Sequence, residues 1–98
     1  MTDDGGRIEA LRTKAGRKLE AARANLAAGF PEDAVSRAYY AMYHAAMALL
    51  ATVRERPRTH RGVHARFHEK FVSPGLFPRD LARAYSAAKE AREYGDYE

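Results

Sequence analysis

Residues 36–50 read SRAYYAMYHAAMALL, and this stretch predicts a helix with two different faces. At about 100° per residue, the large apolar and aromatic residues around it fall on one broad side, which we expect to pack in the core: Val35, Tyr39, Met42, Tyr43, Ala46, Leu49, Leu50 and Val53. The opposite side carries Arg37 and His44, together with the small residues Ala41 and Ala48. Because alanines let another surface approach closely, we expect this stripe to face protein or a ligand rather than open water.

The segments on both sides of this stretch also predict helices. Over residues 7–28, apolar residues recur at intervals of three and four, and Gly29 then follows, as is common just past a helix end. The central helix is expected over residues 31–53, a shorter one over residues 63–72, and a last one from near Pro78. No segment alternates as a strand does. The predicted fold class is therefore all-α, an antiparallel up-and-down bundle of about four helices.

Length and composition bound the class of protein. The chain has 98 residues and no cysteine, so we expect one domain over residues 7–98 after a disordered lead of residues 1–6, without disulfides or thiolate metal sites. No apolar run approaches the roughly 18 residues that span a bilayer, and no signal-peptide core is visible. We therefore expect a cytoplasmic protein with no membrane partner. A domain this small gains stability by pairing with another chain.

The positive charge is concentrated in one segment. Residues 54–70 hold six arginines and lysines against two glutamates, which equals the whole formal net charge of +4. Such a cluster is a candidate footprint for RNA phosphates, and a solvated basic loop is the alternative. The residues that we expect to bind phosphate are Arg54, Arg56, Arg58, His60 and Arg61.

Arg37 and His44 form the candidate catalytic pair. Seven residues are almost two helical turns, so the two side chains share a direction about 10 Å apart along the axis. We expect the guanidinium to be at least half-buried and to need an anion, either a carboxylate such as Glu93 or Asp96 or a phosphate. Histidine accepts and donates protons near neutral pH. The pair therefore fits metal-independent RNA cleavage, although a purely structural role is the alternative.

Three further histidines, at positions 60, 64 and 68, recur every four residues. On a helix this spacing can hold a transition metal, but a structural or surface role is favoured. His60, with Thr59 and Arg61, can instead cap the third helix or help to hold phosphate. We expect no metal and no cofactor. Asp96 is expected to support Arg37 or His44 from a neighbouring helix, or else to pair locally with Arg92.

Three blocks of the sequence together resemble one known family. They are SRAYYAMYHAAMALL, THRGVHARFHEKFV and AREYGDYE, at residues 36–50, 59–72 and 91–98. In this order they resemble the HEPN family of small prokaryotic helical domains. The resemblance implies a helical bundle that commonly dimerises. Many members carry an arginine and a histidine separated by four to six residues and are metal-independent ribonucleases, and Arg37 and His44 match the longest spacing.

The resemblance also implies a partner. Such proteins are often the toxin of a toxin–antitoxin pair, whose antitoxin is a minimal nucleotidyltransferase that can adenylylate a tyrosine near the signature. Tyr40 lies closest to the stripe of Arg37 and His44, whereas Tyr39 and Tyr43 are expected on the core side, so the modified tyrosine stays open. Similar proteins usually continue with a further helix where this chain stops, so the chain is either short or a fragment.

The predicted function is RNA cleavage by a homodimer that brings two stripes of Arg37 and His44 together at its interface. In this prediction, Tyr40 and Asp96 support the catalytic pair. The alternative is a non-catalytic module that binds a nucleotide or docks a nucleotidyltransferase.

Overall fold

The computed structural model describes the backbone of residues 4–97 and the side chains of residues 5–93. Its elements are α1 (Asp4–Ala27), α2 (Pro31–Thr52), α3 (His60–Phe67), the π-helical turn η1 (His68–Val72) and α4 (Arg79–Tyr97). No strand occurs within the described residues, which confirms the all-α class. None of the helices described there has the length and apolar character needed to cross a membrane.

The helix ends lie close to the predicted ones. Helix α1 begins at Asp4, so residues 4–6, which we expected in a disordered lead, are helical, and residues 1–3 lie outside the described part. Gly29 adopts a φ of 87° in the turn that follows α1, a left-handed conformation that favours glycine. Pro31 then occupies the first turn of α2, where its missing N–H costs no hydrogen bond.

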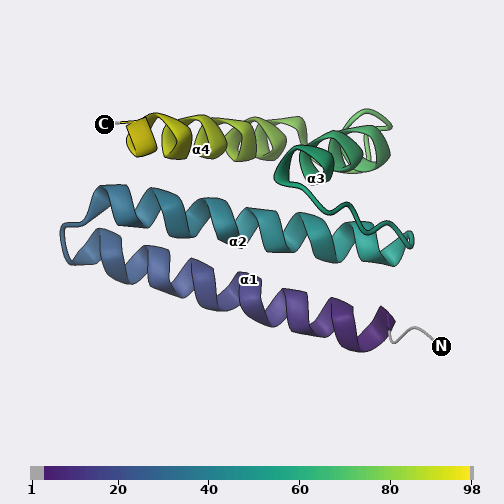
Figure 1. Ribbon diagram of the computed structural model, residues 1–98, viewed down its shortest axis with the longest axis horizontal. Coiled ribbons are helices and arrows are strands. Elements are labelled where there is room, and N and C mark those ends of the chain that lie inside the picture. Colours follow the sequence, from purple (N-terminus) through teal and green to yellow (C-terminus); the bar gives the residue numbers. More distant parts are fainter. Residues whose placement is uncertain (1–3, 98) are drawn as a thin grey trace.

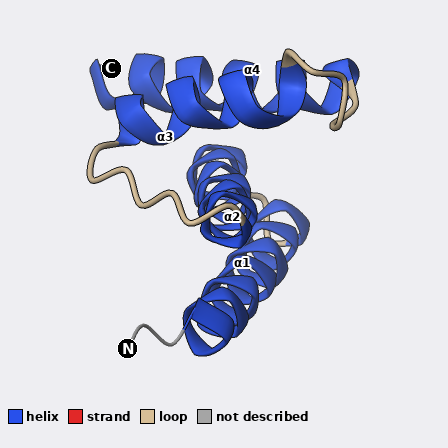
Figure 2. Ribbon diagram, turned by 90° about the vertical axis from the view of Figure 1, so that its right-hand side faces the viewer, coloured by secondary structure: helices blue, strands red, loops and turns tan. Residues whose placement is uncertain are grey.

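Helix α2 is the centre of the bundle. Figure 1 shows α1 antiparallel to α2 along one side, and Figure 2 shows α3 and α4 lying together across the opposite side of α2. The aromatic side of α2 packs against α3, η1 and α4 in a core that includes Tyr39, Leu50 and Val63, each less than 2% exposed. Val53, which we expected in the core, is 47% exposed because α2 ends one residue earlier.

The alanine stripe of α2 packs within the chain. Ala41 and Ala48 are both buried, and the neighbouring helix on that side is α1. The expectation that this stripe faces protein is therefore confirmed for its alanines, with α1 of the same chain as the covering surface, whereas Arg37 is exposed. This packing leaves Arg37 and His44 at the edge of the α1–α2 contact rather than beneath it.

Candidate functional site

A cationic groove runs along the contact between α1 and α2. Its lining consists of Lys14, Arg17, Lys18, Ala21, Arg37 and His44, and its volume is about 380 Å³. Four of these residues are cations and none is acidic. None of the four forms an ion pair with a described side chain. Because like charges at close range repel unless an anion lies between them, the groove is suited to bind phosphate.

Arg37 is more accessible than the sequence indicated. We expected a half-buried guanidinium with a carboxylate partner, but Arg37 is exposed and needs no internal counter-ion. Glu93, one of the two proposed partners, pairs instead with Lys89, with 2.7 Å between Nζ and Oε1. The other proposed partner, Asp96, lies on α4 at a position whose side chain is outside the described residues.

His44 is half-buried at the wall of this groove. Burial lowers the pKa of its imidazole, and the nearby Lys14 and Lys18 lower it further. Its Nδ1 atom is buried and has no hydrogen-bond partner among the described residues. Since the ordinary histidine pKa is about 6.5, a lowered value leaves the ring neutral at pH 7 and able to accept a proton.

Tyr40 joins His44 to residues from two other helices. Its ring centroid lies 6.3 Å from that of His44 and 5.8 Å from that of His60. From α4, Nη2 of Arg92 donates a hydrogen bond of 2.9 Å to the Tyr40 hydroxyl, and the guanidinium carbon lies 5.0 Å from the Tyr40 ring centroid. The Tyr43 ring centroid is nearer to that of His44, at 5.7 Å, so Tyr40 lies close to His44 without being the closest tyrosine.

Arg92 is the residue of this cluster that sequence reasoning missed as a site residue. We had considered it only as a local partner of Asp96. It lies 52 residues from Tyr40 in the chain, and only the packing of α4 against α2 brings the two together. The helical periodicity of either segment contains no signal for this contact.

His60 stands at the start of α3 and reaches back to α2. Its Nδ1 atom lies 2.7 Å from the Tyr39 hydroxyl, and its ring stacks on that of Tyr43 with centroids 4.1 Å apart. Burial lowers the pKa of His60, and the positive charges of Arg92 and Lys89 lower it further. His60 nevertheless remains exposed on one side. It therefore lies beside Tyr40, whose ring is also close to that of His44.

The local sequence explains how His60 is placed. The Thr59 hydroxyl accepts a hydrogen bond of 2.9 Å from the backbone N–H of Gly62, which caps α3 as we had considered from the sequence. A Cβ atom on Gly62 would lie 2.9 Å from the Thr59 hydroxyl oxygen and 3.3 Å from Cβ of Pro57. A larger residue at this position would therefore displace the Thr59 hydroxyl that caps the helix.

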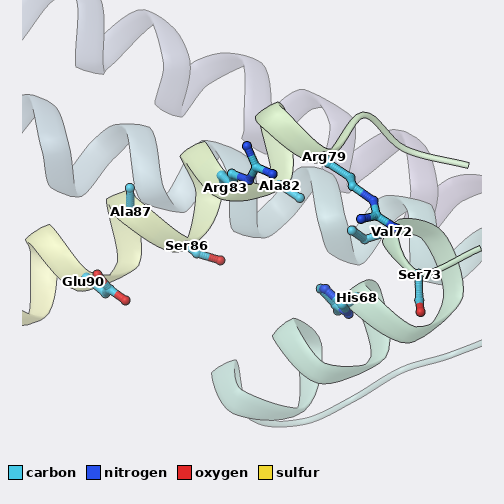
Figure 3. A pocket seen from close by; sticks show the side chains of 9 residues that line it. All are labelled: His68, Val72, Ser73, Arg79, Ala82, Arg83, Ser86, Ala87 and Glu90. Atoms are coloured by element: carbon cyan, nitrogen blue, oxygen red, sulfur yellow. The ribbon is translucent and has the colours of Figure 1, made fainter. Parts of the chain in front are cut away.

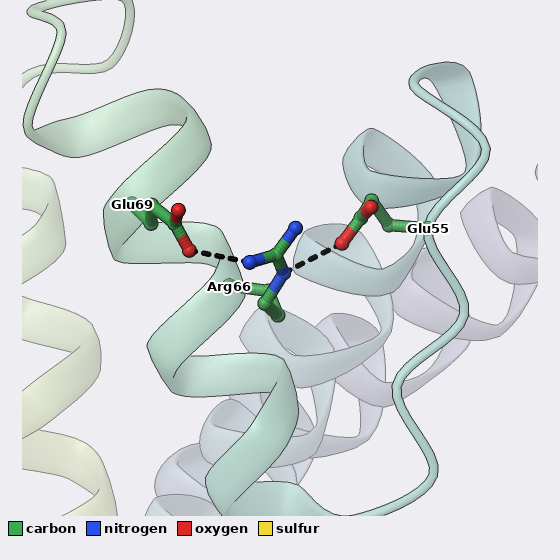
Figure 4. Close-up of polar contacts among 3 residues, drawn as sticks. All are labelled: Glu55, Arg66 and Glu69. Atoms are coloured by element: carbon green, nitrogen blue, oxygen red, sulfur yellow. Dashed lines mark hydrogen bonds and ion pairs between the residues drawn. The ribbon is translucent and has the colours of Figure 1, made fainter.

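The other arginines of the basic segment fall into two groups, one paired within the chain and one exposed. Arg66 is held between Glu55 and Glu69, with 2.6 Å to a carboxylate oxygen of each, as Figure 4 shows. Its charge is thus neutralised within the chain. The other arginines of the segment are all exposed: Arg54, Arg56, Arg58 and Arg61. None of them is among the described residues that line the cationic groove. Their binding of phosphate stays a prediction.

The remaining histidines lie apart from one another. The ring of His64 stacks on that of Tyr85, with centroids 4.0 Å apart. His68 lines a separate cleft between η1 and α4, together with Arg79 and Arg83 (Figure 3). Within the described residues, no group of three or more histidine, aspartate or glutamate side chains is close enough to hold a metal ion.

The comparison with known families agrees with these features. The model of the HEPN domain family matches residues 8–98. The chain belongs to the HEPN domain family. No solved structure gave a significant match.

Several curated relatives are similar over most of the chain. A protein named as a putative toxin from Methanocaldococcus jannaschii is 37% identical over 90 residues, which are 92% of this chain and 67% of the relative. A second protein of that organism, also named as a putative toxin, is 33% identical over 91 residues, or 93% of this chain and 62% of the relative. A UPF0332 protein from Thermotoga maritima is 34% identical over 90 residues, or 92% and 68%. This HEPN chain thus spans about two thirds of the length of these three relatives.

Proposed function

We propose that this HEPN chain is a metal-independent RNA-cleaving protein and the toxin component of a toxin–antitoxin pair. The observation that carries the proposal is the groove in which Arg37 and His44 lie beside three further cations and no acidic side chain. An RNA phosphodiester supplies the negative charge that such a groove lacks. RNA as a substrate is consistent with a cytoplasmic location.

The proposed chemistry uses the two residues of the signature. The exposed Arg37 binds the phosphate and stabilises the charge that develops on it during transfer. His44 enters in the neutral form and moves a proton at the 2′-hydroxyl or at the leaving oxygen. The lysines of α1 hold the RNA strand in the groove. Lysine and arginine side chains thus supply the positive charge that faces the phosphates.

The proposed partner is a minimal nucleotidyltransferase that acts as antitoxin. The names of the two relatives from Methanocaldococcus jannaschii support the toxin assignment. Tyr40 is the tyrosine that we propose as the adenylylation site, because Tyr39 and Tyr43 are buried in the core, whereas Tyr40 is only half-buried. A nucleotide on Tyr40 would cover the groove beside His44.

The test is cleavage of a labelled single-stranded RNA in EDTA. The wild type is expected to produce a 2′,3′-cyclic phosphate, and His44→Ala is expected to lose about 10²- to 10⁴-fold in rate with an unchanged helical circular dichroism spectrum. His68→Ala is the matched control, because this exposed histidine lines a different cleft. No cleavage by a well-folded wild type would contradict the proposal, as would full activity of His44→Ala.

A second candidate function is a non-catalytic module that docks a nucleotidyltransferase or another protein. An apolar groove on the side between α2 and α4 favours it, with Met42, Leu49, Phe77 and the 53% exposed Leu81 in its lining. Such exposed apolar surface is typical of interaction sites. The predicted pairing of two copies would also use apolar surface, and it stays a proposal that sedimentation velocity can test.

A further inference from the structure

Two histidines from different helices flank the same pair of tyrosines. The Tyr43 ring centroid lies 5.7 Å from that of His44 and 4.1 Å from that of His60. Tyr40 contacts both imidazoles from the side on which Arg92 lies. Cleavage of RNA needs one group to take the proton of the 2′-hydroxyl and another to give a proton to the leaving oxygen. One chain therefore holds two candidate proton carriers beside the same two tyrosines.

The two imidazoles differ in what their Nδ1 atoms contact. In His44 this atom is buried without a hydrogen-bond partner in the described structure. The tautomer that accepts a proton at Nε2 carries its hydrogen on Nδ1, and so does the imidazolium, so this atom is an N–H in both states of the base. The neutral form of His44, which is the form of a general base, is favoured by burial of the ring and by the positive charges of Lys14 and Lys18 in the same groove.

In His60 the Nδ1 atom has a partner that serves both protonation states. The Tyr39 hydroxyl lies 2.7 Å away. Burial raises the pKa of Tyr39 to about 12, so its phenol stays protonated at neutral pH. A hydroxyl can donate to the neutral ring and accept from the imidazolium. Because Tyr39 is 1% exposed and fixed in the core, His60 keeps its orientation when it gains a proton.

We propose that His60 is the general acid of RNA cleavage and acts together with His44 of the same chain as the general base, while Tyr39 is a positioning residue for His60. This inference rests on the proposed function. The 2′-oxygen bonds to phosphorus and passes its proton to Nε2 of His44. The bond from phosphorus to the 5′-oxygen breaks, and that oxygen takes the proton from Nε2 of His60. The products are a 2′,3′-cyclic phosphate and a 5′-hydroxyl, and exchange with water resets both rings.

The surrounding charges explain why the substrate completes this arrangement. The ionisable groups around His60 are Tyr39, Tyr40, Tyr43 and His44 on α2, His64 on α3, and Lys89 and Arg92 on α4. Burial lowers the pKa of His60 in the free protein, and the cations on α4 lower it further. A bound phosphodiester brings negative charge next to the ring and favours the imidazolium. The acid is thus charged when the substrate is present.

The deciding experiment compares two RNA substrates that differ in one atom. In the second substrate, sulfur replaces the 5′-bridging oxygen at one linkage, and the thiolate leaves without needing a proton. With ordinary RNA, His60→Ala is expected to lose about 10²- to 10⁴-fold in rate. With the sulfur substrate, the same variant should recover most of this loss. His44→Ala should be slow on both substrates, and His68→Ala should match the wild type on both.

Further variants separate catalysis from folding. His60→Phe keeps a ring to stack on Tyr43 and removes both nitrogens, so it should behave as His60→Ala does. Tyr39→Phe removes only the hydroxyl, which leaves the imidazolium without its acceptor. It should move the alkaline limb of the pH–rate profile for ordinary RNA to lower pH, with little effect on the sulfur substrate. A merely structural role for Tyr39 would lower both rates equally and leave the profile in place.

Mixing inactive chains tests whether the pair lies within one chain. An equimolar mixture of His44→Ala and His60→Ala should stay inactive, because neither chain holds both histidines. Recovery of activity would mean that the two histidines come from different chains and would overturn the assignment. Equal losses on both substrates for His60→Ala would also overturn it, as would a wild-type rate on ordinary RNA. An inactive wild type would instead refute the proposed function and this assignment with it.

Discussion

The cationic groove predicts a specific dependence of RNA binding on salt. Four cations line it, and they include Lys14 and Lys18. If each neutralises one phosphate of a single strand, the logarithm of the binding constant should fall with the logarithm of salt concentration with a slope of about −2.8. Between 50 and 200 mM salt, this slope corresponds to a loss of about 50-fold in affinity.

Replacing two of the four cations should halve this dependence. For Lys14→Gln/Lys18→Gln, the expected slope is about −1.4, and the same change in salt then costs only about 7-fold in affinity. The assay is fluorescence anisotropy of a short labelled RNA, with His44→Ala as the background so that the RNA stays intact. The matched control is Arg79→Gln/Arg83→Gln, which changes the net charge equally in the cleft of Figure 3.

The comparison of the two double variants decides the matter. The control should keep a slope of about −2.8, because its arginines lie outside the groove. If both double variants lower the slope equally, binding follows net charge and not the groove. If Lys14→Gln/Lys18→Gln keeps the wild-type slope, the strand does not pass between α1 and α2, and our reasoning about the groove is wrong.

Two stability predictions follow from the glycines and the histidines. In urea denaturation, Gly62→Ala should lower the free energy of unfolding by about 0.5–2 kcal/mol, because the added Cβ displaces the Thr59 cap. Gly16→Ala, whose added Cβ would meet no atom within 4 Å, should instead raise it by about 0.5–1 kcal/mol. Three histidines have lowered pKa values in the folded state, namely His44, His60 and His64. The unfolded chain therefore takes up protons before the folded one as the pH falls below about 6.5. The urea midpoint should therefore decrease from pH 7.5 to pH 5.5, and a midpoint that rises on acidification would contradict the burial of these rings.

Local chemistry determined the helices of this protein. Gly29, Pro31 and Thr59 act within one or two turns of chain, so the ends of α1, α2 and α3 could be placed from the sequence to within a few residues. The shared direction of Arg37 and His44 also follows from helical periodicity, which needs no tertiary information. The same periodicity separated the buried Tyr39 and Tyr43 from the half-buried Tyr40.

The site itself depends on how the helices pack. The exposure of Arg37, the lysines of α1 beside His44, and the contacts of Arg92 and His60 with the tyrosines of α2 arise from the relative rotation and register of separate helices. The period of one helix shows which residues share a face, but not which face of another helix will cover it. The sequence by itself therefore determined that Arg37 and His44 stand together. Only the tertiary structure decided what surrounds them, because those contacts are set by the packing of the core.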